Sequence, residues 1–378
     1  MSLFQKEQSY LGVDIGAGGM KLVELRKAKG RPQLWTYGIV EEAMDIHPIG
    51  VPEKTAQELS EEHQGSPTKK PQPSSPIDLG DPRIDRYAGF LKDLVRATHV
   101  SSRVVTASLP VSHIFHAVVT LPTVEEKDVD FHVLAKVKKM LPRPIEEMQV
   151  LHQVIPREAL STSSKDIKVL VTAAPRDLVA FYTAIFQRAG LKLRDLETEA
   201  FAIERSLVGR DTATVMVVDM GAERTNFFIM DHGLPITHRT IQIGGNDIDA
   251  LLQKSLGASA DMVGQIKKDM GSLPANELKQ DMFMNALDPV INEIQYSFEL
   301  FLGQSGNEGK KPEKIILTGG AALFPPVLSG VAAATGMKVF VGDPWARVVY
   351  QEGLKQVLDT IAPRMSVAIG LALRNVLS

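Results

Sequence analysis

The sequence predicts an α/β protein of two lobes, each with a mixed β-sheet flanked by helices. The chain has 378 residues, which is more than one hydrophobic core usually organises. One apolar strand ends at Asp14 and another at Asp219, and a glycine-containing turn follows each of them. Each turn opens one half of the chain and is followed by further strands, so we interpret the two halves as an ancient duplication.

The amino-acid composition excludes several classes of function and site. Hydrophobic residues make up 44% of the chain and charged residues 23%, as is normal in globular proteins. The net charge of -3 gives no reason to expect nucleic-acid binding. The absence of cysteine excludes disulfides, thiolate metal sites and cysteine catalysis, and it fits a reducing cytoplasm. No run approaches the roughly 18 apolar residues that span a bilayer, so we expect no direct membrane insertion.

The first half opens with alternating apolar residues, which predict strands at 10–14, 20–26 and 33–40. Residues 47–82 then hold seven prolines and few apolar residues. We expect a flexible surface insertion there, with a short interaction tract as the alternative. Asp81 is expected to cap the next helix, with Pro82 at its first position.

Periodicity predicts the remaining elements. Four apolar residues recur at four-residue steps and predict a helix that Pro142 ends: Val129, Val133, Val137 and Leu141. Gly190 is expected to stop a helix at residues 178–189. The other expected extended segments are 104–109, 113–121, 148–155, 167–173, 213–220, 226–230, 234–243 and 314–317. The other expected helices are 244–256, 288–302 and 365–377.

The first turn has the residue types that bind a phosphate together with a metal ion. Its small residues let backbone N–H groups approach a phosphate closely: Gly16, Ala17, Gly18 and Gly19. The Asp14 carboxylate would repel bare phosphate, but it suits a hydrated divalent cation placed between them. Lys21 offers positive charge to terminal phosphates. A plain β-hairpin would use the same glycines, so this turn alone leaves both interpretations open.

The second turn repeats the order aspartate, apolar residue, glycine. Asp219 takes the place of Asp14, and Gly221 and Ala222 form the turn. Two residues with groups that bond phosphate oxygens follow, Thr225 and Asn226. One such turn is weak evidence. Two of them, each between apolar strands, are much stronger evidence that phosphate and a metal ion lie between two lobes.

Two further glycine pairs mark junctions between strands and helices. An apolar strand at 314–317 leads into Gly319, Gly320 and Ala321, where bare backbone leaves room for a flat adenosine. Gly244 and Gly245 open the expected helix at 244–256. Either pair is also ordinary at a strand-to-helix junction, so neither decides the function alone.

Together these motifs resemble the first phosphate loop, second phosphate loop and adenosine loop of the actin/Hsp70/sugar-kinase ATPase superfamily, over nearly the whole chain. The resemblance implies an actin-like, ribonuclease H-like ATPase fold that binds ATP and Mg²⁺, with Asp14 and Asp219 at the metal. Residues 197–202 are similar to the link between the lobes in that superfamily. Glu199 is therefore the candidate that orients the attacking water, alongside Asp14 as a catalytic residue; a solvated glutamate at a helix end is the alternative. Lys267 corresponds to the helix where the superfamily contacts adenosine or ribose.

Further segments are similar to the PilM family, cytoplasmic actin-like proteins of type IV pilus assembly that are related to the cell-division protein FtsA. They include Ala107-Ser108-Leu109-Pro110, Thr120-Leu121-Pro122, Met140-Leu141-Pro142-Arg143-Pro144 and Ile243-Gly244-Gly245-Asn246. Two features depart from the family. Residues 136–139 are basic where acidic residues are usual, which leaves the identity of the partner open, and the proline-rich segment is longer than expected.

The resemblance also implies a domain organisation. Lobe 1 begins the chain, and a small FtsA-like subdomain is inserted before the chain returns to lobe 1. Lobe 2 follows with a helical subdomain, and a C-terminal helix packs back on lobe 1. The expected boundaries are 1–110, 111–198, 199–362 with helices at about 245–305, and 363–378.

The function implied by this resemblance is that of an ATP-binding scaffold in a type IV pilus or related secretion machine. The protein would be cytoplasmic and held at the inner membrane by partners. A groove would bind the N-terminal cytoplasmic tail of a PilN-like inner-membrane protein, with other inner-membrane components and self-association as further contacts. We expect ATP binding with weak or no hydrolysis. The alternatives are a polymerising FtsA- or MreB-like cytoskeletal protein and, behind it, a sugar or acetate kinase, for which we find no sugar-binding cluster of Asp, Asn and Trp.

Overall fold

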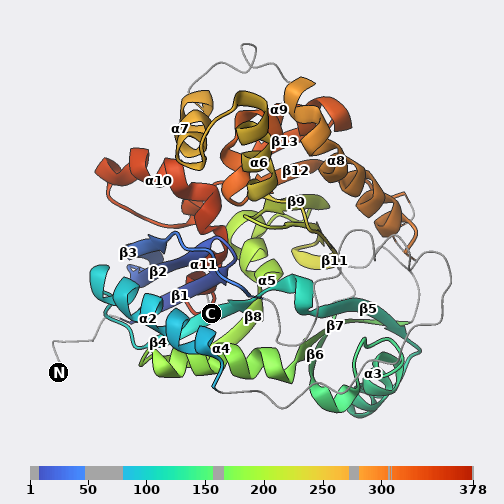
Figure 1. Ribbon diagram of the computed structural model, residues 1–378. Coiled ribbons are helices and arrows are strands. Elements are labelled where there is room, and N and C mark those ends of the chain that lie inside the picture. Colours follow the sequence, from blue (N-terminus) through green and yellow to red (C-terminus); the bar gives the residue numbers. More distant parts are fainter. Residues whose placement is uncertain are drawn as a thin grey trace.

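A computed structural model describes residues 8–46, 80–155, 166–271, 281–304, 307 and 309–376 (Figure 1). The proline-rich stretch expected at 47–82 lies outside the described residues except for its last three. Within the described part, the strands form two five-stranded sheets and one three-stranded sheet. No helix among the described residues is both long and apolar enough to cross a membrane.

The first sheet has the strand order β3-β2-β1-β4-β8. Strands β1, β2 and β3 run antiparallel, whereas β4 and β8 continue the sheet parallel to β1. Leu11, Val13 and Ile15 point from β1 into a core shared with α2 and α4, so this face of the strand is fully apolar. The bounds are β1 Ser9–Gly16, β2 Gly19–Ala28, β3 Arg31–Val40, β4 Val104–Leu109, β8 Lys192–Thr198, α2 Pro82–Ala97 and α4 Arg176–Arg188.

The second sheet repeats the same plan, with the order β11-β10-β9-β12-β13. Here too the first three strands are antiparallel and the last two are parallel to the first. One face packs against α6, α8 and α9, and α7 follows α6 (Figure 1). The bounds are β9 Val215–Met220, β10 Thr225–Asp231, β11 Leu234–Ile241, β12 Lys314–Thr318, β13 Lys338–Val341, α6 Gly245–Leu256, α7 Ala260–Gly271, α8 Asp281–Leu302 and α9 Pro325–Thr335.

Two short helices lie between the sheets and join the lobes. Helix α11 (Ser366–Leu373) packs Ala368 and Ala372 with residues of the first sheet, and Val367 and Leu371 with the second. Helix α5 (Glu199–Ile203) shares the second of these clusters. Every described side chain of α11 is buried, which explains why its sequence is apolar on all sides. Helix α10 (Lys355–Ile361) precedes α11 on the outside (Figure 1).

A third sheet, with the order β5-β7-β6, is inserted between β4 and α4. Its alternate residues divide it into two faces. Val169 and Val171 of β7 pack under helix α3, while Leu170 and Thr172 of the same strand face the opposite way and line a pocket against lobe 1. The bounds are β5 Phe115–Leu121, β6 Met148–Val154, β7 Ile167–Pro175 and α3 Val129–Val137.

Most of the expected elements are present, with shifted ends. Asp81 caps α2 as predicted, because its carboxylate accepts a hydrogen bond of 2.8 Å from the backbone N–H of Arg83. Strand β8 was not predicted, since its sequence KLRDLET mixes charged and apolar residues without clear alternation. Helix α3 ends at Val137 rather than at Pro142, and α8 begins before residue 288, with Pro289 inside it.

Candidate functional site

The two predicted turns have the same register. In the first hairpin Asp14 pairs with Lys21 across the strands, and in the second Asp219 pairs with Asn226. The two turns face each other across the lobes, because a Cβ added at Gly18 would lie 3.0 Å from the Cβ of Ala222. The structure therefore brings the tips of both turns to one place.

Asp14 is buried at the base of the first turn. One of its oxygens accepts a hydrogen bond of 2.8 Å from the Ser108 hydroxyl, and the other lies 3.7 Å from the Lys21 amine. Gly16 lies beside that amine, since a Cβ there would be 3.6 Å from Lys21 Nζ. At Gly19 the backbone has φ +119° and runs against the carbonyl oxygen of Val40, which only glycine permits.

In the second turn the polar side chains hold the turn itself. The Thr225 hydroxyl donates to the carbonyl of Ile243 at 2.7 Å, so it is already engaged. The Asn226 amide donates to Asp219 and accepts from the Thr240 hydroxyl. Burial raises the pKa of Asp219 to about 6 against the lowering effect of the Asn226 hydrogen bond, and the nearby Asp14 charge raises it further.

The other two glycine segments pack directly around the second turn. A Cβ on Gly319, whose φ is +85°, would lie 2.4 Å from the carbonyl oxygen of Met220. A Cβ on Gly244 would lie 2.5 Å from the carbonyl oxygen of Ala222. The N–H of Gly245 donates to Gly221 at 2.8 Å. Gly320 and Ala321 begin the 3-10 turn Gly320–Leu323, and a Cβ on Gly245 would lie 3.7 Å from the Ala321 side chain.

Glu199 approaches the two turns from the N-terminus of α5. It is buried and accepts a hydrogen bond of 3.1 Å from the backbone N–H of Val111. Burial raises its pKa to about 7, Arg224 opposes that rise, and the Asp14 and Asp219 charges add to it. Glu199 is thus not a solvated residue at a helix end but a buried acid whose pKa lies near neutral pH.

Sequence reasoning missed two residues of this cleft. Arg224 is buried, donates a hydrogen bond to the Ser112 hydroxyl, and is a cationic neighbour of Glu199 and Asp219. Ser108 donates to Asp14 from the neighbouring parallel strand β4. An arginine at the tip of a proposed phosphate-binding turn was a usable signal, whereas nothing in the sequence pairs Ser108 with Asp14.

The residues fit a magnesium–phosphate group better than a protein-only metal site. No cluster of three or more His, Asp or Glu side chains that could hold a metal ion occurs in the described part of the chain. Mg²⁺ is commonly bound through one or two carboxylates plus phosphate oxygens and water, which Asp14 and Asp219 could supply together with a ligand. Lys267 does not join this group, because its amine pairs with Asp249 between α7 and α6.

A second concave site lies on the other side of α5. It is a pocket of about 730 Å³ between the inserted sheet and lobe 1. About half of its lining residues are apolar, with Gln149 and Gln153 of β6 on one side and Arg194 of β8 and Arg374 at another. The apolar residues in its wall are Leu109, Ile114, Leu151, Leu170, Ala174, Val179, Leu193, Leu196 and Phe201.

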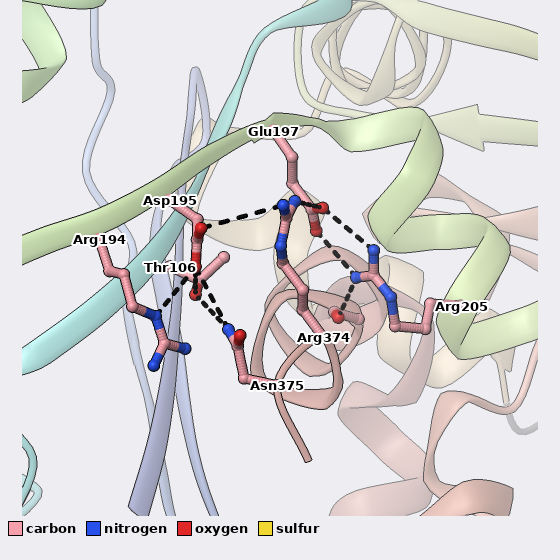
Figure 2. Close-up of polar contacts among 8 residues, drawn as sticks. Thr106, Arg194, Asp195, Glu197, Arg205, Arg374 and Asn375 are labelled. Carbon is pink, nitrogen blue, oxygen red and sulfur yellow. Dashed lines mark hydrogen bonds and ion pairs between the residues drawn. The ribbon is translucent and has the colours of Figure 1, made fainter. Parts of the chain in front are cut away.

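An ion-pair cluster forms one end of this pocket (Figure 2). Arg205 binds both oxygens of Glu197, at 2.8 and 3.0 Å, and Arg374 approaches Glu197 from the C-terminal end of α11. Asp195 accepts from Arg194 at 3.0 Å and from Asn375 at 3.3 Å. Because the Glu197 side chain is only 5% exposed while Arg194 and Arg374 are about 40% exposed, this end of the pocket presents guanidinium donors.

Comparisons with known proteins agree with this architecture. A family model described as type IV pilus assembly protein PilM matches residues 77–376. A solved PilM-PilN type IV pilus biogenesis complex is 22% identical, covers 97% of this chain and 98% of that chain, and has a TM-score of 0.74. The ethanolamine utilization protein EutJ from Carboxydothermus hydrogenoformans is 14% identical, covers 97% and 89%, and has a TM-score of 0.50. The predicted actin-like fold is confirmed.

Proposed function

We infer the function from the premise that this chain belongs to the PilM family of type IV pilus assembly proteins. We propose that it is an ATP-binding scaffold whose nucleotide state is linked to the binding of a partner's tail. The alternatives, a polymerising cytoskeletal protein and a sugar or acetate kinase, are not favoured by the family match. The protein would work in the cytoplasm, held at the inner membrane by its partner.

ATP would lie between the lobes, with Mg²⁺ at Asp14 and Asp219. The facing turns support this placement, as do the bare backbone segments at Gly244 and Gly319 that pack around the second turn. Lys21 would neutralise phosphate charge, and Glu199 would hold a water near the terminal phosphate. The remaining site residues proposed from the sequence are Gly16, Ala17, Gly18, Gly19, Gly221, Ala222, Thr225, Asn226, Lys267, Gly320 and Ala321. Of these, Thr225 and Asn226 would act by shaping the turn, since their side chains are engaged within it.

The partner's tail would lie in the pocket of about 730 Å³ beside the inserted sheet, and this pocket is the observation that carries the scaffold proposal. Its apolar lining residues suit the apolar side chains of an extended segment. The guanidinium groups of Arg194 and Arg374 suit main-chain carbonyl oxygens of the same segment. The similar solved complex pairs a PilM with a PilN, so we propose a PilN-like N-terminal tail as the occupant.

The tail assignment is tested with a synthetic peptide that matches the N-terminal cytoplasmic residues of the PilN-like protein of the same organism. Calorimetry should show binding to the wild-type chain and at least tenfold weaker binding to Leu151→Asp, which places a charge in the apolar wall. Val154→Asp is the matched control, because Val154 is exposed on the same strand and does not line the pocket. Equal binding by both variants would place the tail elsewhere.

The nucleotide assignment is tested separately by measuring ATP affinity with and without Mg²⁺. Asp14→Ala and Asp219→Ala should each remove most of the magnesium-dependent part of the affinity, because each deletes a proposed metal ligand. Normal binding by both variants would show that the site lies elsewhere. Robust phosphoryl transfer to a small hydroxyl compound would replace the scaffold proposal with a kinase.

A further inference from the structure

One short segment of the chain reaches both proposed sites. Glu199 lies in the cleft with Asp14 and Arg224 among its charged neighbours, while Glu197 and Arg205 line the tail pocket on the other side. Residues 197 and 199 are two apart in the chain, a distance of roughly 7 Å in extended backbone. The two sites are therefore not remote from each other, since the end of β8 and the start of α5 form a wall that they share.

This segment is bound tightly to α11. A Cβ on Gly370 would lie 1.8 Å from the carbonyl oxygen of Ala202, so the backbones of α5 and α11 are in direct contact. Arg205 strengthens the contact by donating to the carbonyl of Gly370 at 2.6 Å while it also holds Glu197. The side chain of Arg374 donates to Glu197 from the C-terminal end of α11 (Figure 2). The two helices have little room to move separately.

Helix α11 extends this unit to the strand that carries Asp14. A Cβ on Gly12 would lie 2.3 Å from the carbonyl oxygen of Ala368 and 2.6 Å from the N of Ala372. Gly12 stands two residues before Asp14 on β1. A change of the lobe angle at the Asp14 turn must therefore move α11, and α11 must carry α5 with it, because close-packed backbones do not deform continuously.

One wall of the pocket is formed by the α5–α11 pair, and another wall is formed by the inserted sheet. Phe201 lies on α5, and Arg205 and Arg374 lie just after α5 and α11, whereas Leu151 and Leu170 lie on the inserted sheet. Movement of one wall against the other would change the width of the pocket. The guanidinium group of Arg374 would move with the first wall.

We propose that the α5–α11 pair, held together by the Arg205–Glu197–Arg374 ion pairs, is the element through which nucleotide sets the affinity of the tail pocket. This inference rests on the proposed function and names how its two sites are coupled. Binding at one site changes the affinity at the other only if each ligand binds more tightly to one of two arrangements of a shared structural element. By thermodynamic linkage the tail peptide must then change the affinity for nucleotide by the same factor.

The test compares the affinity of the PilN-like tail peptide with and without a saturating non-hydrolysable ATP analogue and Mg²⁺. In the wild-type chain the ratio of the two affinities should be about 5- to 100-fold, the usual range of such coupling. In Arg374→Gln the ratio should fall measurably toward one, because Glu197 loses one of its two guanidinium links to α11 and keeps only Arg205. Arg374 is partly exposed, so the variant is expected to fold, and circular dichroism checks this.

Arg194→Gln is the matched control. Arg194 lines the same pocket, but it lies on β8 and pairs with Asp195, so it does not join α5 to α11. Its substitution should weaken peptide binding equally with and without nucleotide and leave the ratio at the wild-type value. The coupling is overturned if the ratio stays at the wild-type value in Arg374→Gln, or if it is one in the wild-type chain. In either case, binding of both ligands to the wild-type chain still upholds the proposed function. Failure of the wild-type chain to bind either ligand overturns both.

Discussion

The two Asp-apolar-Gly turns share one backbone plan but differ in their chemistry. Gly16 pairs with Gly19 in the first turn, and at the matching place in the second turn the N–H of Gly221 donates to the carbonyl of Arg224 at 2.9 Å. The position filled by Gly19 in lobe 1 is thus filled by Arg224 in lobe 2. Lobe 1 has no room there, because a Cβ on Gly19 would lie 1.9 Å from the carbonyl oxygen of Val40.

This difference shows how two turns with one backbone plan supply a cation from different positions. In lobe 1 the cation is Lys21, directly opposite Asp14 in the hairpin. In lobe 2 the residue opposite Asp219 is neutral Asn226, and the cation is moved to Arg224 at the tip of the turn. Asp14, Asp219 and Glu199 thus have two cationic neighbours, which come from different positions of the two turns.

The largest effect on stability is expected from adding a side chain to the first turn at Gly19. Gly19→Ala should lower the free energy of unfolding by roughly 3 kcal/mol or more, because its Cβ meets backbone and its φ is positive. Urea unfolding measures the change. Gly30→Ala is the control, since Gly30 also has positive φ (+78°) but open space around it, and it should cost only about 1 kcal/mol. Equal costs would show that the Val40 contact is relaxed in solution.

An intermediate effect is expected at Glu199, where the charges of both turns meet. Burial raises the pKa of Glu199 to about 7 in the folded chain, against 4.5 for an ordinary glutamate. The carboxyl is protonated in both states below about pH 4.5, so it costs nothing there. As the pH rises from there through 7, the carboxyl ionises more readily in the unfolded chain than in the folded one, so the free energy of unfolding falls. Glu199→Gln should therefore be more stable than wild type at pH 8, by roughly 1–3 kcal/mol, with the gain vanishing near pH 4.5.

Thermal and urea unfolding across this pH range measure the Glu199 effect, with Glu197→Gln as the control. Glu197 lies two residues away, but its carboxylate is held by Arg205 and Arg374. Its substitution leaves a partly buried arginine without its carboxylate, so stability should fall at pH 8 instead of rising. A stability gain in both variants would mean that the sign of the Glu199 effect has another cause.

The smallest effect is expected from making the first turn resemble the second. Lys21→Asn places at position 21 the residue that stands at the matching position 226. The aspartates remain, so ATP should still bind with Mg²⁺, but several-fold to about tenfold more weakly, because one partly exposed charge–phosphate contact is lost. Calorimetry at fixed ionic strength measures the change. An unchanged affinity would show that Arg224, and not Lys21, supplies the main positive charge.

The sequence by itself determined the local features. Strand periodicity, the cap at Asp81 and the two glycine turns depend on residues close together in the chain, and the repeated order of strands was enough to predict two lobes with mixed sheets. The chemistry of an Asp-apolar-Gly turn is likewise local, so the residue pattern alone pointed to Asp14 and Asp219. The mixed charged and apolar sequence of β8 hid that strand, because a register shift between Leu193 and Asp195 breaks the alternation of its two faces.

Only the tertiary structure decided which distant residues share the cleft and the pocket. Ser108 meets Asp14, Arg224 meets Glu199, and Arg374 meets Glu197, and each of these encounters is set by parallel strand pairing or helix packing over long chain separations. The tertiary structure also changed the role expected of Thr225 and Asn226, because their polar groups make hydrogen bonds within the protein instead of being free for phosphate oxygens. Burial and charge are properties of the assembled neighbourhood, which the order of residues along the chain does not display.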